Sequence, residues 1–307
     1  MFEQFDEFVV SLGEVEIAGR VSRASDVQRP PLLLLHGHPE THMIWHRIAD
    51  RLAEHYTVVV PDLRGYGRSS KPQSDPLHLA YSKRTMARDQ VLLMEHFGNQ
   101  LGFEKFAVCA HDRGARVAHR LLVDYPELVT QAMLLDIAPT LDMYESTSRA
   151  FAEAYFHWFF LIQPEPLPET LINGNPRAYV ENLMGSRYAG LGPFPPEILD
   201  HYVTSLSEPG AAHAMCEDYR ASSTIDLDHD RDDRKRNRII DIPIRVLWGS
   251  HGVIERLFDP LALWGALASR VTGRSVNAGH YLPEEVPDEI FEEILSFIPT
   301  TNSLRTE

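Results

Sequence analysis

The stretch that decides the fold is Ala110-His111-Asp112-Arg113-Gly114-Ala115-Arg116, which lies between an apolar run and a helical pattern. Its form, small–x–nucleophile–x–Gly, is typical of a sharp strand-to-helix turn. Small flanking residues are needed there because the central residue has a strained backbone and lifts its side chain above the sheet. Serine is the usual central residue, and here it is Asp112. A carboxylate can attack carbon without a base, but the ester that forms must then be hydrolysed. An aspartate at this place could also simply cap the helix.

Short apolar runs ending in Gly, His or Asp occur on both sides of this turn. They are Pro31–Leu35, Thr57–Val60, Phe106–Ala110, Ala132–Leu135 and Ile244–Trp248. Because every position is apolar, they indicate strands buried on both faces of a parallel sheet. Helical patterns lie between them, at Trp45–His55, Thr85–Leu101 and Ala115–Tyr125. This alternation predicts a doubly wound, mostly parallel α/β sheet.

The alternation stops between Leu141 and Ile225, where the chain is rich in aromatic residues and proline and has no strand-like run. Helical stretches are expected there at Thr147–Phe160, Pro176–Met184 and Pro195–Ser205. We therefore predict a core made of residues 1–140 and 226–299, an inserted helical cap at 141–225, and a disordered tail at 300–307. The charged stretch 226–238 is expected to be a solvated connection, with a nucleic-acid-binding patch as the alternative.

Composition narrows the possible partners. The 307 residues include 29 Lys and Arg against 44 Asp and Glu, a net charge of −15, which argues against nucleic acid or an anionic membrane as partner. Two distant cysteines and no visible signal peptide or spanning segment predict a cytoplasmic protein. The sequence has no metal-binding spacing, phosphate loop or dinucleotide fingerprint. We expect no metal, no cofactor, and water as the only co-substrate.

Three further motifs suit the same fold. His36-Gly37-His38-Pro39 follows the first buried run, Pro61–Ser69 forms a Gly-rich turn after the second, and Gly279-His280 lies near the C-terminus. Together they resemble the α/β-hydrolase superfamily over about residues 5–298. Within it, the chain is similar to the fluoroacetate (haloacetate) dehalogenases. The motifs that carry this resemblance are HDRGAR at 111–116, His157-Trp158, CEDYRA at 216–221, GHYLPEE at 279–285 and HGxPxTHxxWH at 36–46.

The resemblance implies the catalytic roles. Asp112 would attack the halogen-bearing carbon, and His280 would activate water against the resulting ester. Asp136 would orient His280, with Glu255 as the alternative acid because many α/β-hydrolases place theirs after the strand predicted at Ile244–Trp248. Backbone N–H groups of His38 and Arg113 would form the oxyanion hole.

Arg113 and Arg116 flank the nucleophile, a disadvantage for a neutral substrate. For a haloacetate they can hold the carboxylate and offset its repulsion from Asp112. The alternative is that they only form salt bridges. By resemblance, His157, Trp158 and Tyr219 form the halide site, since a leaving fluoride needs hydrogen-bond donors in place of water. Taken singly, such aromatic residues could equally belong to the cap core.

The chain departs from the family pattern at His38, where Phe is usual, and at Arg187, an aromatic position by alignment. These departures bear on fluoride cleavage more than on the reaction class, so a dehalogenase preferring chloro- or bromoacids is one alternative. An epoxide hydrolase is another. It would need two cap tyrosines, for which the chain offers Tyr155, Tyr179, Tyr188, Tyr202 and Tyr219. A non-catalytic binding protein would be expected to lack one of Asp112, Asp136 or His280. The resemblance also suggests a homodimer.

Overall fold

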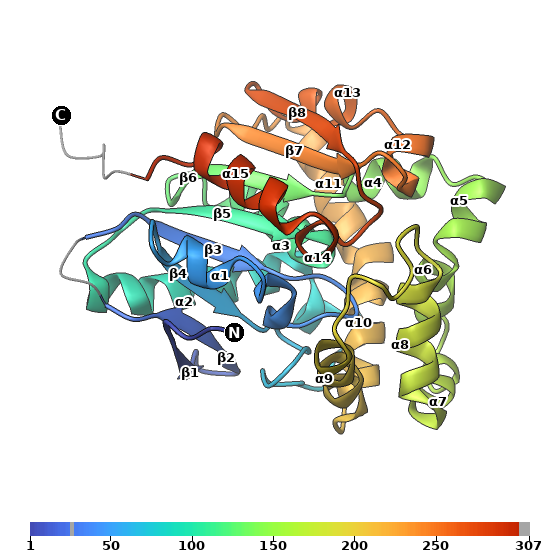
Figure 1. The fold of residues 1–307 in the computed structure, drawn as a ribbon. Coiled ribbons are helices and arrows are strands. Elements are labelled where there is room, and N and C mark those ends of the chain that lie inside the picture. Colours follow the sequence, from blue (N-terminus) through green and yellow to red (C-terminus); the bar gives the residue numbers. More distant parts are fainter. Residues whose placement is uncertain (25–27, 301–307) are drawn as a thin grey trace.

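The structure is a computed structural model of the chain, and it describes residues 1–24 and 28–300. At its centre lies one eight-stranded sheet in the order β1-β2-β4-β3-β5-β6-β7-β8 (Figure 1). The strands are β1 Phe5–Ser11, β2 Glu16–Ser22, β3 Pro31–Leu35, β4 Thr57–Pro61, β5 Phe106–His111, β6 Val129–Leu135, β7 Ile244–Gly249 and β8 Val271–Val276. All pairs from β4 across to β8 are parallel, whereas β2 is antiparallel to both β1 and β4. The predicted α/β-hydrolase sheet is confirmed.

Strand β3 shows why the sheet is covered on both faces. All five of its residues are buried. Leu33 and Leu35 belong to the apolar cluster that includes α2 (Lys83–Leu101) and α3 (Asp112–Asp124), whereas Leu32 and Leu34 belong to the cluster of α1 (Ala49–Leu52) and α15 (Pro287–Phe297). Because successive side chains of a strand point to opposite faces, a run of leucines buries apolar surface against both helical layers.

Shorter helices complete the core. They are η1 His42–Trp45, η2 Leu79–Tyr81, α12 Val253–Leu257, α13 Pro260–Gly265 and α14 Leu282–Glu285. The helix expected over Trp45–His55 is broken into η1 and α1, because Ile48 leaves helical geometry at φ −124° and ψ −13°. The bend allows both Trp45 and Ile48 to be fully buried.

The helices from α4 to α10 gather beyond the carboxyl ends of the parallel strands (Figure 1). They are α4 Thr140–Glu145, α5 Arg149–Ala154, α6 Phe156–Leu161, α7 Leu167–Gly174, α8 Pro176–Gly185, α9 Pro196–Ser207 and α10 Ala211–Ser223. We call residues 141–225 the cap; its exact boundaries remain a prediction. The helix expected over Thr147–Phe160 is interrupted at Tyr155, which separates α5 from α6.

The charged stretch 226–238 is not the solvated connection that its composition suggested. Most of it forms helix α11 (Ile225–Lys235), in which Asp226 and Asp233 are buried. Asp233 accepts a hydrogen bond from Arg120 of α3, and Arg234 donates to Asp142 of α4. The charged residues of this helix therefore pair with residues that are distant in the sequence. The charge pattern alone could not identify those partners.

No helix within residues 1–24 and 28–300 is both long enough and apolar enough to cross a membrane. Of the expected disordered tail, residues 301–307 lie outside the described residues.

Candidate active site

Asp112 lies at the junction of β5 and α3 with a positive φ of 43°, a conformation that ordinary side chains rarely adopt. Two glycines leave room for this turn. A Cβ on Gly114 would lie 2.4 Å from the carbonyl oxygen of His36, and one on Gly37 would lie 2.5 Å from the Cβ of Asp112. The Gly114 N–H instead donates to the His36 carbonyl at 2.8 Å. Close backbone approach on both sides thus holds Asp112 in a strained position.

The Asp112 carboxylate is buried and ionised. Its Oδ1 accepts a hydrogen bond from the backbone N–H of His38 at 3.0 Å, and its Oδ2 lies 3.9 Å from Nε2 of His280. Burial alone would raise the pKa of Asp112, but His280, His111 and the two nearby arginines outweigh it and hold that pKa below its usual value. A carboxylate that stays ionised in a buried site is suited to nucleophilic attack.

His280 is oriented by Asp136, whose Oδ2 lies 2.5 Å from the imidazole Nδ1. Asp136 directly follows β6 with a φ of 51°, and its other oxygen accepts a hydrogen bond from the Gly249 N–H at 2.9 Å. The alternative acid, Glu255, instead accepts a hydrogen bond from the indole of Trp248. Nε2 of His280 is therefore left to face Asp112.

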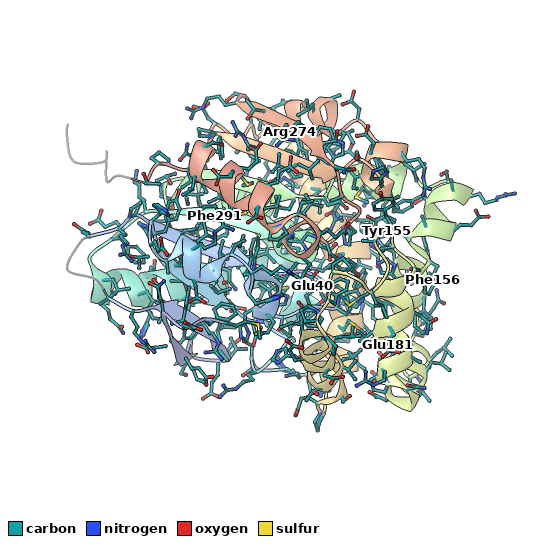
Figure 2. All side chains as sticks on the ribbon, viewed as in Figure 1. Glu40, Tyr155, Phe156, Glu181, Arg274 and Phe291 are labelled. Carbon is teal, nitrogen blue, oxygen red and sulfur yellow. The ribbon has the colours of Figure 1, made fainter. Side chains whose placement is uncertain are left out.

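A buried ion pair joins three of the loops around the nucleophile. Glu40 Oε2 accepts hydrogen bonds from the Gly37 N–H at 2.8 Å and from His111 Nδ1 at 3.1 Å, and neither Glu40 nor His111 has an exposed side chain. His111 Nε2 lies 2.8 Å from the carbonyl oxygen of His280. A histidine that contacts a carboxylate and a carbonyl must donate from both nitrogens, so it is a cation. Glu40 lies near the middle of the molecule (Figure 2), and no role was predicted for it from the sequence.

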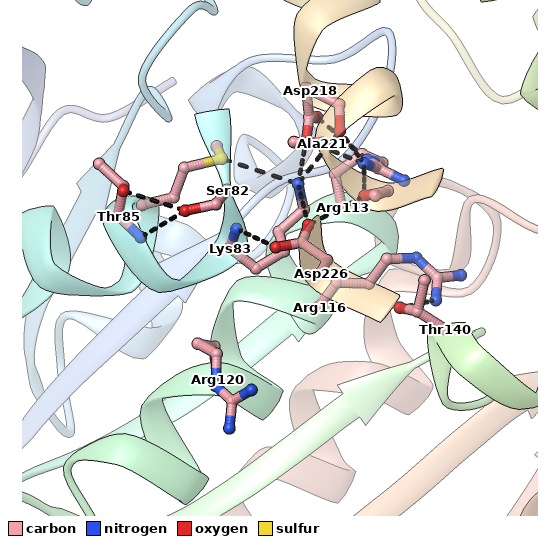
Figure 3. A network of polar contacts seen from close by, with 12 residues as sticks. Ser82, Lys83, Thr85, Arg113, Arg116, Arg120, Thr140, Asp218, Ala221 and Asp226 are labelled. Atoms are coloured by element: carbon pink, nitrogen blue, oxygen red, sulfur yellow. Dashed lines mark hydrogen bonds and ion pairs between the residues drawn. The ribbon is translucent and has the colours of Figure 1, made fainter. Parts of the chain in front are cut away.

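Arg113 is less available for binding a substrate than its sequence position suggested. Its Nε and Nη2 donate to the two carboxylate oxygens of Asp218 at 3.0 and 2.8 Å, and Nη2 also contacts Ser222 Oγ at 2.5 Å (Figure 3). Only Nη1 remains buried without a hydrogen-bond partner. Arg113 therefore binds Asp218, and not a substrate, in a bidentate manner. Only its Nη1 is available to a substrate.

Asp218 is the centre of a buried polar network (Figure 3). It also pairs with Lys83 of α2 and accepts a hydrogen bond from the Tyr66 hydroxyl at 2.7 Å. Burial opposes its ionisation, but Arg113 and Lys83 lower its pKa below the usual range. Asp218 is part of the CEDYRA motif at 216–221, but no role was predicted for it. The sequence feature that could have indicated this role is an acidic residue beside Tyr219 in the cap. A carboxylate that is buried there needs a cation as its partner.

Arg116 has no carboxylate within 4.0 Å among the described residues. Its Nη1 donates to the carbonyl of Ala138 at 3.1 Å and to Thr140 Oγ1 at 2.9 Å, and its guanidinium lies 4.7 Å from the Trp158 ring centroid. Its Nε is buried without a partner. Burial and the charge of Arg113 lower the pKa of Arg116, and the charge of Asp112 offsets part of this effect. The unpartnered Nε is free to donate to a further acceptor.

His157, Trp158 and Tyr219 come together as expected for a common site. The Tyr219 ring centroid lies 5.8 Å from that of His157 and 6.3 Å from that of Trp158. His157 Nδ1, Trp158 Nε1 and the Tyr219 hydroxyl are all buried and have no hydrogen-bond partner. Burial, followed by the charge of Arg187, lowers the pKa of His157 well below its usual value. The imidazole is therefore neutral, and these groups can all act as neutral donors.

His38 turns its side chain toward the same aromatic group. Its ring lies parallel to that of His157, with centroids 5.9 Å apart, and its Nε2 lies 3.1 Å from the Tyr179 hydroxyl. Burial lowers the pKa of His38 to about 3, so the ring is neutral. The neutral imidazole of His38 thus packs within the aromatic group, while the backbone N–H of the same residue binds Asp112.

No group of three or more His, Cys, Asp or Glu side chains within the described ranges could hold a metal ion.

Comparison with known proteins gives a family match, two relatives and one similar crystal structure. The family described as alpha/beta hydrolase fold matches residues 30–172. The chain is 40% identical to a fluoroacetate dehalogenase from Burkholderia sp., over 99% of this chain and 97% of that protein. It is 32% identical to a soluble epoxide hydrolase from Corynebacterium sp. (strain C12), over 87% and 89% of the two chains. The crystal structure of a protein from Nostoc sp. PCC 7120 has a TM-score of 0.89 and 49% identity, covering 97% of this chain and 99% of that one.

Proposed function

Since this chain belongs to the alpha/beta-hydrolase family that includes the Burkholderia fluoroacetate dehalogenase, we propose that it is a hydrolytic dehalogenase of short 2-haloacids. In the first step, Oδ2 of Asp112 forms a bond to the halogen-bearing carbon and halide leaves with the bonding electron pair. Arg116 and Nη1 of Arg113 hold the substrate carboxylate. The donors of His157, Trp158 and Tyr219 bind the departing halide.

In the second step, water hydrolyses the ester on Asp112. His280 takes a proton from the water through Nε2, Asp136 stabilises the resulting imidazolium, and the hydroxyl adds to the ester carbonyl. The His38 N–H, already bonded to Oδ1, stabilises the oxyanion that forms on that oxygen. Collapse of the adduct releases the 2-hydroxyacid and regenerates the carboxylate. The net reaction of haloacid and water gives hydroxyacid, halide and one proton.

The observation that carries this proposal is a set of buried donors without partners around an ionised Asp112. They are Arg113 Nη1, Arg116 Nε, His157 Nδ1, Trp158 Nε1 and the Tyr219 hydroxyl. Buried donors are nearly always satisfied in folded proteins, so several exceptions in one place support a ligand that is rich in acceptors. A carboxylate and a halide together provide such acceptors.

The covalent step can be tested with His280→Gln, which keeps the nucleophile and removes the base. Incubation with chloroacetate should leave a carboxymethyl ester on Asp112, detected as added mass on the peptide that contains it. With wild-type enzyme in excess and heavy-oxygen water, one turnover should place the label in the Asp112 carboxylate. Label found only in the hydroxyacid would show direct attack by water and would refute the scheme.

An epoxide hydrolase is the second candidate, favoured by the Corynebacterium relative and by the buried, unpartnered hydroxyl of Tyr219. Asp112 and His280 would serve equally well there, but Arg116 would then face a neutral substrate. A panel of fluoro-, chloro- and bromoacetate against styrene oxide distinguishes the two enzymes. Turnover of styrene oxide alone would favour the epoxide hydrolase, and no turnover at all would favour a binding protein.

A further inference from the structure

Arg187 is a second cation near the site that has no acidic partner. It follows α8, and no carboxylate oxygen of the described residues lies within 4.0 Å of its guanidinium. Its Nη1 makes a long contact of 3.3 Å with the carbonyl of Ala154, and its Nε is buried without a partner. The guanidinium lies 4.9 Å from the centroid of the Tyr155 ring. Tyr281 adds a side-chain hydrogen bond with Arg187. None of these contacts supplies the negative charge that would compensate a largely buried cation.

The Tyr155 ring connects Arg187 to the aromatic residues of the site. Tyr155 lies on the inner side of the cap, whereas its neighbour Phe156 lies on the outer side (Figure 2). The Tyr155 and Trp158 ring centroids are 5.6 Å apart, and Trp158 carries Arg116 over its own ring. Each of the two guanidinium groups therefore lies against one ring of this pair.

The charge of Arg187 acts on the groups around Asp112. After burial, it is the largest influence that lowers the pKa of His157, and it also contributes to the low pKa of His38. In return, Tyr155 and Tyr281 first, and then Asp136 and Asp112, raise the pKa of Arg187. Arg187 is therefore electrostatically part of the site rather than of the cap surface.

The other buried cations of this region are already matched, because Asp218 binds Arg113 and Lys83, and Glu40 binds His111. One carboxylate, such as that of a haloacetate, can satisfy Arg116 but leaves Arg187 unmatched. We propose that Arg187 binds a second anionic group on the substrate. The preferred substrates are then 2-halo dicarboxylates, such as 2-chlorosuccinate. This inference rests on the proposed dehalogenase function.

The reaction balances in the same way as for a haloacetate. The Asp112 oxygen bonds to C2 of 2-chlorosuccinate, and chloride leaves with the electron pair. Hydrolysis of the ester then gives 2-hydroxysuccinate and one proton. Arg116 holds the carboxylate at C1, and Arg187 holds the carboxylate at C4, so the position of both ends fixes which face of C2 meets Asp112.

The test compares Arg187→Met with wild type on each enantiomer of 2-chlorosuccinate and of 2-chlorobutanoate, which lacks the second charge. Arg177→Met is the matched control, because Arg177 lies on α8 but is exposed and pairs with Glu181 and Asp200. Losing a charge-assisted hydrogen bond costs roughly 1.5–3 kcal/mol, so the ratio of kcat/KM for the two substrates should fall by about tenfold or more in Arg187→Met. The ratio should not change in Arg177→Met. An unchanged ratio in Arg187→Met would overturn the inference.

A binding measurement separates this inference from the proposed function. Titration calorimetry with succinate and butanoate should show that wild type prefers succinate, that Arg187→Met loses the preference, and that Arg187→Lys keeps part of it. If wild type releases no chloride from any haloacid, the proposed function fails, while a succinate preference that depends on Arg187 still supports a second anion subsite. Equal binding of succinate and butanoate to wild type would overturn the subsite even in an active dehalogenase.

Discussion

Replacing Glu40 by Gln removes the negative charge from the buried pair that joins the loops of Gly37, His111 and His280. The amide oxygen of Gln can still accept the Gly37 N–H, so the change acts chiefly on His111. Without its counter-ion, a fully buried histidine is expected to be neutral. It can then no longer donate from both nitrogens, and its contact with the His280 carbonyl depends on one tautomer.

The size of the effect follows from the pKa of His111. Burial alone would lower that pKa, but Glu40 first and Asp112 second raise it from 6.5 to about 9. One pKa unit corresponds to about 1.4 kcal/mol, so protonation of His111 stabilises the folded chain by about 3 kcal/mol. Because the folded pKa is the higher one, this stabilisation is complete below pH 6.5 and is lost as the pH rises through 9. Glu40→Gln should lack this pH dependence.

The assay is urea unfolding of wild type and Glu40→Gln at a series of pH values from below 6.5 to above 9. The difference in the free energy of unfolding between them should shrink by about 3 kcal/mol across that range. Glu54→Gln, at an exposed position, is the control and should follow wild type. If the difference between wild type and Glu40→Gln is the same at every pH, His111 is not held as a cation and the reasoning is wrong.

Three further results are expected. Asp112→Ala should lower kcat for chloroacetate by about 10⁴-fold or more, measured as chloride release, because no other group can attack the carbon; substantial residual turnover would assign the nucleophile elsewhere. Arg116→Gln should weaken kcat/KM for chloroacetate by roughly tenfold to a hundredfold but change binding of a neutral amide such as chloroacetamide much less, and equal losses would mean that Arg116 is structural. Gly37→Ala places a Cβ 2.5 Å from that of Asp112, so it should destabilise the fold by about 1–3 kcal/mol and reduce activity, and an unchanged melting temperature would contradict the close approach.

The central strands could be predicted from the sequence because they are buried on both faces. Strand β3 spans the same residues as the predicted apolar run at 31–35, since a parallel strand covered on both faces has no position for a polar side chain. The edge hairpin of β1 and β2 was not predicted. Only Phe5 and Val10 of β1 are buried, and the strand includes the exposed Asp6 and Glu7, so it has no continuous apolar run.

Local motifs were sufficient to predict that Asp112, Asp136 and His280 lie close together. Each of them follows or lies near the carboxyl end of a parallel strand. They did not reveal how Arg113 is used. Its partner, Asp218, lies 105 residues away on α10. Whether a buried arginine binds a substrate or an acid of its own chain depends on tertiary contacts, and these cannot be read from spacing.

The polar network around Asp218 makes Arg113 and Arg187 unequal as starting points for laboratory evolution. Replacing Arg113 would leave the buried carboxylate of Asp218 with Lys83 as its remaining cationic partner. Variants at position 113 should therefore lose stability before they gain new substrates. Arg187 has no carboxylate partner among the described residues, so replacing it should cost little stability. Libraries that seek a different acceptance of haloacids should therefore randomise position 187 and leave position 113 untouched.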